Sequence, residues 1–254
     1  MKEVLRGGHP LFSLIWITMF EINEKGIDVV QVTGIGPHGI NVMLLDNFYQ
    51  NPDEVRELAL KGRRESHKSA FGRTAFMPTW EFAAKTKHIF DGICFDENIW
   101  FNETDREVYE ESWKNAGFMV RYTREEEWKS DPKVLIPHQE SYPLEWRPCQ
   151  FVLKVCLNNE FEDHGGEEIF TFMGDTTVPK SCDYLYKDEL AKPTEEAWKD
   201  LSLNIHSSMT WEKVSTIPME YNRAMLFQSQ ILHRPQMVNE TFKDHDRLEQ
   251  FLFL

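Results

Sequence analysis

Short apolar runs with a period of two fill the C-terminal half of the chain, and they constrain the fold more than any other feature. The runs cover residues 118–122, 151–157, 169–172, 224–227 and 248–254. Successive side chains of a strand point to opposite faces of a sheet, so this period predicts a series of short strands. Many short strands in succession favour a β-sandwich or a β-barrel.

The N-terminal half instead carries helix signals. Asn51, Pro52 and Asp53 offer an N-cap, a proline suited to the first turn and an acid near the positive end of the helix dipole. An apolar stripe then runs to Gly62, which we expect to end the helix. Residues 40–45, just ahead of it, are typical of a strand.

Two further segments of this half predict helices. Residues 82–90 place apolar side chains at helical spacing, and Thr104 with Glu107 forms a capping box for a helix that runs to Gly117. Helices followed by short strands predict a mainly β fold with flanking α-helices.

We expect one domain over residues 1–254, because no internal repeat, low-complexity tract or Gly/Ser linker marks a boundary. Residues 1–117 should supply an N-terminal strand and supporting helices, and residues 118–254 the β core. Within that core, residues 173–218 lose the period of two and predict a long insertion over one end of the barrel. Such an insertion is either a lid or substrate-binding loop or a plain surface loop.

Net charge and the spacing of the cysteines indicate which partners and which cellular compartment the chain suits. The formal net charge is −14, from 42 acidic and 28 basic residues, and no run of Lys or Arg offsets it, so we expect no nucleic-acid partner. Four cysteines stand far apart without CxxC spacing, which favours a reducing, cytoplasmic setting. The apolar stretch at residues 11–20 is too short to cross a bilayer as a helix and precedes no cleavage site, so we expect no membrane association.

Two of the nine histidines stand in a chemically suggestive context. His138 and Glu140 are two residues apart in a segment that we expect to be extended, where both side chains project to the same side. His233 follows a predicted strand and its loop. Two imidazoles and one carboxylate on one face of an ion are the set that non-haem iron oxygenases use to hold Fe(II) while leaving other positions open. A surface histidine beside an acid is the alternative, because His-x-Glu often arises by chance.

Arg247 opens the apolar terminal run. Arginine is costly to bury, so an inward-pointing Arg247 needs an anion, and a dicarboxylate cosubstrate gripped by its planar fork would provide one. Strand alternation would then put Arg247 on the same face as Phe251 and Phe253, with Leu248 and Leu252 on the other. An arginine at the solvent edge of the strand is the alternative.

The order of these motifs resembles the prolyl-4-hydroxylase-like branch of the 2-oxoglutarate- and iron(II)-dependent oxygenases, including its bacterial members. The segments that carry the resemblance are Asp46-Asn47-Phe48-Tyr49-Gln50-Asn51-Pro52, His138-x-Glu140, Cys156-Leu157-Asn158-Asn159, Gly165-Gly166-Glu167-Glu168-Ile169-Phe170, Asn222-Arg223, His233 and Arg247.

The resemblance implies a double-stranded β-helix, a cupin-like jelly-roll whose mouth holds Fe(II) on His138, Glu140 and His233. It also implies that Arg247 pairs with the distal carboxylate of 2-oxoglutarate, and that Tyr122 hydrogen-bonds the same carboxylate unless it is an ordinary core tyrosine. The implied reaction splits 2-oxoglutarate to succinate and carbon dioxide and hydroxylates a C–H bond of a small molecule or a peptide side chain.

Two positions depart from the family pattern and motivate a rival reading. Relatives usually have Asp where this chain has Glu140, and Ser or Thr where it has Glu249. Glu249 would bring a negative charge toward the cosubstrate unless it is protonated, turned away or paired with a base. The alternative is therefore a jelly-roll binding or structural protein that kept the barrel and lost turnover.

Overall fold

The computed structural model describes residues 20–35, 40–69, 72–77, 87, 91, 118–130, 137, 151–159, 165–172, 211–229, 231–237 and 240–253. Within these residues the protein is built mostly of antiparallel strands, with few helices. The helical segments are α2 (Pro52–Gly62), a 3-10 turn directly after it (Arg63–Glu65) and α5 (Glu125–Ser130). None of the helices in this described part has the length and apolar content that crossing a bilayer requires.

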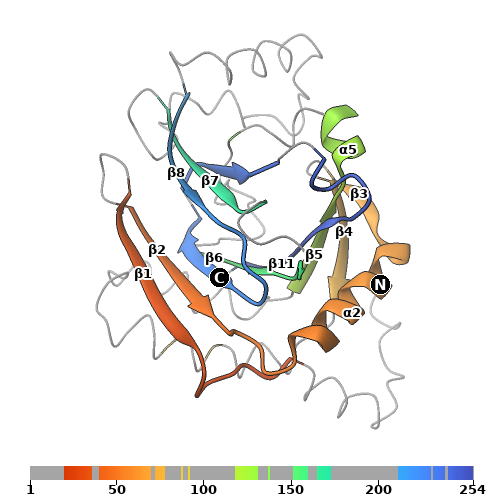
Figure 1. The fold of residues 1–254 in the computed structure, drawn as a ribbon, viewed down its shortest axis with the longest axis horizontal. Helices are drawn as coiled ribbons and strands as arrows, with labels where there is room; N and C mark the ends of the chain where they lie inside the picture. Colours follow the sequence, from red (N-terminus) through yellow and green to blue (C-terminus); the bar gives the residue numbers. More distant parts are fainter. Residues whose placement is uncertain are drawn as a thin grey trace, which may run out of the picture.

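The strands form two sheets (Figure 1). The larger sheet has eight strands, which lie in the order β1 (Asp28–Ile35), β2 (Ile40–Asp46), β9 (Ala224–Gln228), β6 (Phe151–Cys156), β11 (Arg247–Phe253), β5 (Phe118–Thr123), β4 (Gly72–Met77) and β3 (His67–Ser69). The smaller sheet has three, in the order β10 (His233–Pro235), β7 (Glu167–Phe172) and β8 (Trp211–Ile217). Every pairing in both sheets is antiparallel.

Two long stretches of chain pass together from one sheet to the other. β6 pairs with β11 in the larger sheet, where Leu153 faces Leu252 across the ladder, and β7 pairs with β10 in the smaller sheet, where Ile169 faces His233. The segments that contain β6–β7 and β10–β11 therefore run antiparallel to each other in both sheets. β8 and β9 repeat this arrangement one strand further out, because β8 pairs with β7 and β9 pairs with β6.

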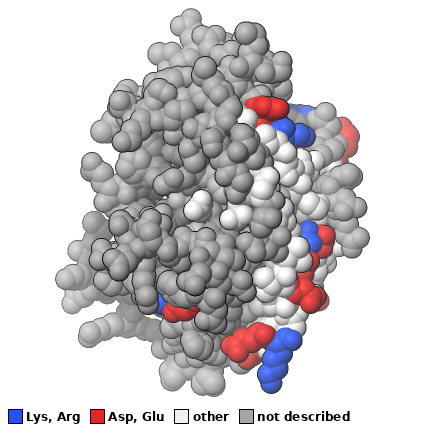
Figure 2. All heavy atoms as spheres, turned by 90° about the vertical axis from the view of Figure 1, so that its left-hand side faces the viewer, with Lys and Arg blue, Asp and Glu red and all other residues white. Residues whose placement is uncertain are grey.

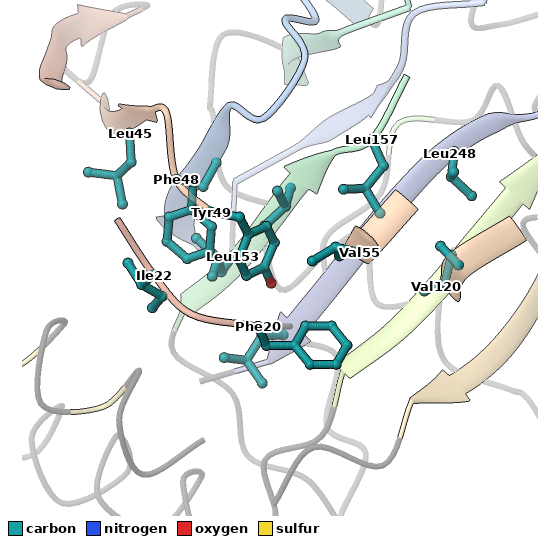
Figure 3. Close-up of a cluster of buried hydrophobic side chains, with 14 of the residues drawn as sticks. Phe20, Ile22, Leu45, Phe48, Tyr49, Val55, Val120, Leu153, Leu157 and Leu248 are labelled. Atoms are coloured by element: carbon teal, nitrogen blue, oxygen red, sulfur yellow. The ribbon is translucent and has the colours of Figure 1, made fainter. Parts of the chain in front are cut away.

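The larger sheet is covered on one face by α2 and the segment before it. We call the residues packed there the outer core. It joins Val55 and Ala59 of α2 to Leu153 and Leu248 of the sheet. Figure 3 shows Phe20, Ile22, Phe48 and Tyr49 packed in the same cluster as these sheet residues.

The other face of the larger sheet packs against the smaller sheet. The apolar residues between them, which we call the inner core, include Val152, Phe227 and Phe251 from the larger sheet and Ile169 and Ile217 from the smaller one. A sheet buried on both faces requires apolar residues at successive positions, and all six residues of β6 are buried. Arg247 and Phe251 of β11, and Val152, Lys154 and Cys156 of β6, lie on the face toward the smaller sheet.

The predicted strands of the C-terminal half are confirmed within one or two residues at each end, apart from the insertion. β8 occupies the last part of the predicted 173–218 insertion, so that part is a strand of the smaller sheet. Trp211–Ile217 does not show a clean period of two, and its pairing with β7 decides its conformation. Residues 173–210 lie outside the described residues.

The N-terminal half contributes more strands than predicted. Besides β2, which matches the predicted strand, the larger sheet includes β1, β3 and β4. β1 exposes Val29 and Val30 at 54% and 46% but buries Ile35 in the inner core, and β3 and β4 contain Lys68 and Arg73, which interrupt the apolar pattern that predicts a strand. Pairing with neighbouring strands holds them in place.

α2 agrees with the predicted helix in its bounds but not in how it begins and ends. The Asn51 side chain makes no capping hydrogen bond. Gly62 has a helical φ of −63°, and the chain continues into the 3-10 turn instead of stopping there. The helix predicted at residues 82–90, Lys87 excepted, and the one predicted at residues 104–117 lie outside the described residues.

Candidate functional site between the sheets

Charged side chains lie buried between the two sheets, beside the inner core. We call them the interior charge cluster. It comprises Arg121 of β5, Lys154 of β6, Glu167 of β7, and Arg247 and Glu249 of β11, each no more than 7% exposed. Strand alternation points them all to one side of the larger sheet or to the facing side of the smaller sheet. Burying charge in this way is costly unless the charges are paired, so their contacts are informative.

Arg247 holds the start of the smaller sheet against the larger one. Its Nε donates to the carbonyl of Gly165 at 2.5 Å, and its Nη2 donates to the carbonyl of Gly166 at 2.9 Å and to Glu167 Oε1 at 2.8 Å. Its Nη1 forms an ion pair with Glu249 Oε2. A Cβ at Gly166 would lie 1.8 Å from the Ile217 carbonyl oxygen, so only glycine allows this close approach.

The predicted inward orientation of Arg247 is confirmed, and its guanidinium pairs with carboxylates of the chain itself. Arg247 is buried on the face that carries Phe251 of the inner core, while Leu248 and Leu252 belong to the outer core. The anions that pair with its guanidinium are Glu167 and Glu249 of the chain itself.

Lys154 is the second buried cation of the cluster. Its Nζ lies 3.1 Å from Glu167 Oε1, and 5.5 Å and 4.9 Å from the ring centroids of Phe227 and Phe251. The ammonium group makes no hydrogen bond, and neither do Glu167 Oε2 and Glu249 Oε1. The ion pair and the two aromatic faces are therefore its only compensation for burial among the described residues.

The two carboxylates of the cluster respond oppositely to the same surroundings. Burial alone would raise the pKa of Glu167, but the charges of Lys154, Arg247 and His233 together hold it well below its usual range. Burial dominates at Glu249 and raises its pKa, although Arg247 opposes the shift. Glu167 is thus the ionised carboxylate of the cluster, and Glu249 is the one that takes up a proton more readily.

His233 is fully buried, and two of its contacts help to orient its ring. Its Nδ1 lies 2.8 Å from the Ile231 carbonyl oxygen, and its ring meets Phe227 edge-on at a centroid distance of 4.8 Å. A carbonyl oxygen can only accept, so Nδ1 is the donor in this contact. A metal-binding histidine is typically held in this way, with one ring nitrogen on a carbonyl and the other available as ligand.

The thiol of Cys156 is less suited to metal binding or nucleophilic chemistry. It is buried on β6, and burial raises its pKa to about 12. A thiol in that environment is neutral at physiological pH, and thiolate is the form that binds metals or attacks substrates.

The other residues predicted for the site have different outcomes. His138 and Glu140 lie outside the described residues, and among the residues that are described no group of three His, Cys, Asp or Glu is placed to hold a metal ion. Tyr122 belongs to the outer core, on the opposite face of the sheet from Arg247, and its hydroxyl donates to the carbonyl of Ala59 in α2. These contacts match the core-tyrosine alternative, and Tyr122 has no part in the site proposed below.

Sequence reasoning missed Lys154 and gave Glu167 no role. Lys154 is the one charged residue within the apolar strand Phe151–Cys156, and that interruption was the available signal. Glu167 follows two glycines at the start of β7, where an acid is indistinguishable in sequence from an exposed one. Its neighbour Glu168 points away from the interior and pairs with Lys213 and Arg234.

Comparisons with known proteins give limited results. No protein-family model matches the sequence, and the search of curated proteins found no match. A prolyl-4-hydroxylase from Pseudomonas putida is similar in structure, with a TM-score of 0.39 and 10% identity over 90% of this chain and 92% of its own. The non-haem alpha-ketoglutarate-dependent epimerase SnoN from nogalamycin biosynthesis has a TM-score of 0.38 and 14% identity over 88% of this chain and 76% of its own. Likenesses this distant carry no conclusion, so the proposals below depend on the contacts of this chain.

Proposed function

We propose that the chain is a non-haem iron oxygenase that decarboxylates 2-oxoglutarate to succinate and hydroxylates a small molecule or a peptide side chain. His138, Glu140 and His233 are the proposed metal ligands, and the cations of the interior, Arg247 among them, form the proposed cosubstrate site. The observation that carries the proposal is His233, a buried imidazole whose Nδ1 is held by a carbonyl in the same interior as the charge cluster.

Strand order supports the jelly-roll that such an enzyme needs. In a double-stranded β-helix, paired stretches of chain wind together so that their strands fall alternately in two facing sheets. Here β6 and β7 run with β11 and β10 from the larger sheet to the smaller one. We therefore propose that β5, β11, β6 and β9 form one half of the β-helix and that β10, β7 and β8 belong to the other.

The donor set fits a divalent first-row metal. Two neutral imidazoles and a carboxylate give two nitrogens and one oxygen, the ligand types of non-haem iron(II) sites. When bound, iron(II) with 2-oxoglutarate supplies the oxidising power for the reaction. The chain's own part is to hold the ion and the cosubstrate in an interior from which water is largely excluded.

Electrostatics of the interior favour an anionic ligand. Among the described residues, Arg121, Lys154 and Arg247 supply three positive charges and Glu167 with Glu249 supplies two negative ones, which leaves one positive charge in excess when all are ionised. Protonation of Glu249 would increase that excess. A buried site of this sign attracts a carboxylate.

A second candidate, a binding or structural protein without turnover, is favoured by one specific contact. Glu249 pairs with the guanidinium of Arg247, the group that the resemblance assigns to 2-oxoglutarate. In that reading the chain supplies its own anion where an enzyme would bind its cosubstrate.

Succinate formation tests the proposal. Purified protein is incubated with Fe(II), ascorbate, oxygen and 2-oxoglutarate, with and without a panel of metabolites and peptides, and succinate is quantified. We expect succinate from the wild type and none from His233→Ala or His138→Ala. His245→Ala is the matched control, because His245 is exposed and should leave turnover unchanged. Bound metal is measured in the same proteins. If both ligand variants retain metal as the wild type does, the assignment is rejected and the binding-protein alternative is favoured.

A further inference from the structure

Lys154 lacks the hydrogen bonds that a buried ammonium group needs. It is fully buried on a central strand of the larger sheet, its Nζ has three N–H donors, and none of them makes a hydrogen bond. Lysine is among the residues least often buried completely, and removing its charge from water is costly without acceptors. A hydrophobic residue would fill the same place in this apolar strand more easily, so the charge requires an explanation.

Arg247 is less suited than Lys154 to bind a further anion, because each of its three guanidinium nitrogens already has a partner. Its Nε and Nη2 donate to Gly165, Gly166 and Glu167, and its Nη1 pairs with Glu249. An anion that approached Arg247 would have to displace Glu249. Lys154 shares only Glu167 Oε1, at 3.1 Å, and keeps donors for a further acceptor.

The two carboxylates of the cluster also suit an acceptor at Lys154. Burial raises the pKa of Glu249, and a protonated Glu249, whose Oε1 also lacks a hydrogen bond, can donate to an incoming carboxylate instead of repelling it. Glu167 Oε2, which also lacks a hydrogen bond, belongs to the carboxylate whose Oε1 pairs with Lys154.

We propose that Lys154 is the residue that binds a carboxylate of a small dicarboxylic acid between the sheets, while Arg247 acts as a positioning residue that holds Glu167, Glu249 and the start of β7 around it. The choice of a dicarboxylate as ligand rests on the proposed function. The assignment of the binding residue rests on the contacts of Lys154 alone. It differs from the expectation that Arg247 makes this contact.

Binding measurements on the full chain test the proposal without relying on turnover. Succinate and 2-oxoglutarate are titrated calorimetrically into wild-type protein, without metal and with Mn(II) in place of iron. Lys154→Met keeps the length of the side chain and removes its charge, and we expect it to weaken binding of both acids by roughly thirty-fold or more. Lys154→Arg should recover part of this affinity. Lys213→Met, which removes a partly exposed lysine paired with Glu168, should bind like the wild type.

A second variant keeps the test decisive if Lys154→Met folds poorly. Lys154→Met with Glu167→Gln removes both charges of the buried pair, so no charge of that pair is left without its partner. We expect the double variant to fold and still to bind neither acid. Wild-type affinity in either folded variant would overturn the assignment, and so would a wild type that binds neither acid.

The outcomes separate this inference from the proposed function. If Lys154→Met still forms succinate with an unchanged KM for 2-oxoglutarate, Lys154 is not the binding residue and the oxygenase proposal stands. The wild type could instead bind succinate through Lys154 but form no succinate when it is incubated with 2-oxoglutarate and iron. In that case the inference stands and the oxygenase proposal fails.

Discussion

A single buried arginine ties the two sheets together at the residue scale. Arg247 contacts two backbone carbonyls before β7 and two carboxylates, one on each sheet. Removing one partner of a buried ion pair costs far more stability than the intact pair contributes in net terms, because the remaining charge stays buried without a partner. Arg247 is therefore important for folding whether or not it contacts a ligand.

Replacing Arg247 with methionine should lower the free energy of unfolding by roughly 3–5 kcal/mol, measured by urea titration. Lys243→Met is the control, because Lys243 and Glu240 form an exposed pair and its loss should cost about 0–1 kcal/mol. Adding Glu249→Gln to Arg247→Met should recover part of the loss. Equal stability of Arg247→Met and the control would contradict the role assigned to this residue.

Gly62 offers a second test at the residue scale. In a helix, Gly→Ala normally stabilises by about 1 kcal/mol, and Gly62 has a helical φ of −63°. However, a Cβ there would lie 2.9 Å from the Tyr122 hydroxyl, which is buried and donates to Ala59. We expect Gly62→Ala to destabilise the wild type by roughly 1–3 kcal/mol.

The same substitution should behave differently when the hydroxyl is absent. In a Tyr122→Phe background the clash disappears, so Gly62→Ala should be neutral or stabilising. Comparison of the four proteins by urea titration gives the coupling energy directly. A coupling energy near zero would show that the Tyr122 hydroxyl is not the reason that this position requires glycine.

At the scale of elements, α2 docks on the larger sheet through a narrow apolar face. Val55 and Ala59 are fully buried in the outer core, while Leu60 on the same helix is 39% exposed. We expect Val55→Ala to cost roughly 1.5–3 kcal/mol, from lost transfer free energy and the cavity left behind. Leu60→Ala removes a larger side chain but should cost less than Val55→Ala. Thermal and urea unfolding check the order, and a reversed order would mean that the helix docks through a different face.

At the scale of the molecule, charged side chains occupy two environments, the exposed surface and the interior between the sheets. On the face in Figure 2, the described surface carries both kinds of charged side chain near each other, exposed to water and salt. Pairs of that kind contribute little to stability. The pH dependence of stability should therefore depend largely on buried groups, and Glu167 and Glu249 contribute with opposite sign.

Glu167 stabilises the fold above its unfolded-state pKa of roughly 4.3, and that contribution is lost as the pH falls toward its depressed folded pKa. Glu249 has a raised folded pKa, so its contribution is present below roughly pH 4.3 and is lost as the pH rises through the folded value. Urea titrations between about pH 3 and pH 7 should show a smaller loss on acidification for Glu167→Gln than for the wild type. Glu249→Gln should instead gain relative to the wild type as the pH rises. Parallel profiles for all three proteins would contradict these shifts.

The sequence by itself determined the features that depend on local pattern. The period of two predicted β6, β9 and β11 within a residue or two, because each buries enough apolar surface to show in its composition. Local signals also predicted the extent of α2, and strand alternation predicted the inward face of Arg247. The metal ligands His138 and Glu140 remain predictions from sequence.

Tertiary structure alone decided what depends on partners distant in the chain. β1, β3 and β4 each pair with a neighbouring strand, although the sequence pattern did not predict a strand at any of them. Tyr122 packs in the outer core and donates to Ala59 of α2, and sequence could not decide between this position and one facing the cosubstrate. Lys154, Glu167 and Glu249 come from three strands and form one cluster only because the two sheets face each other. Whether a buried charge is paired depends on that three-dimensional arrangement, and no local pattern in the sequence encodes it.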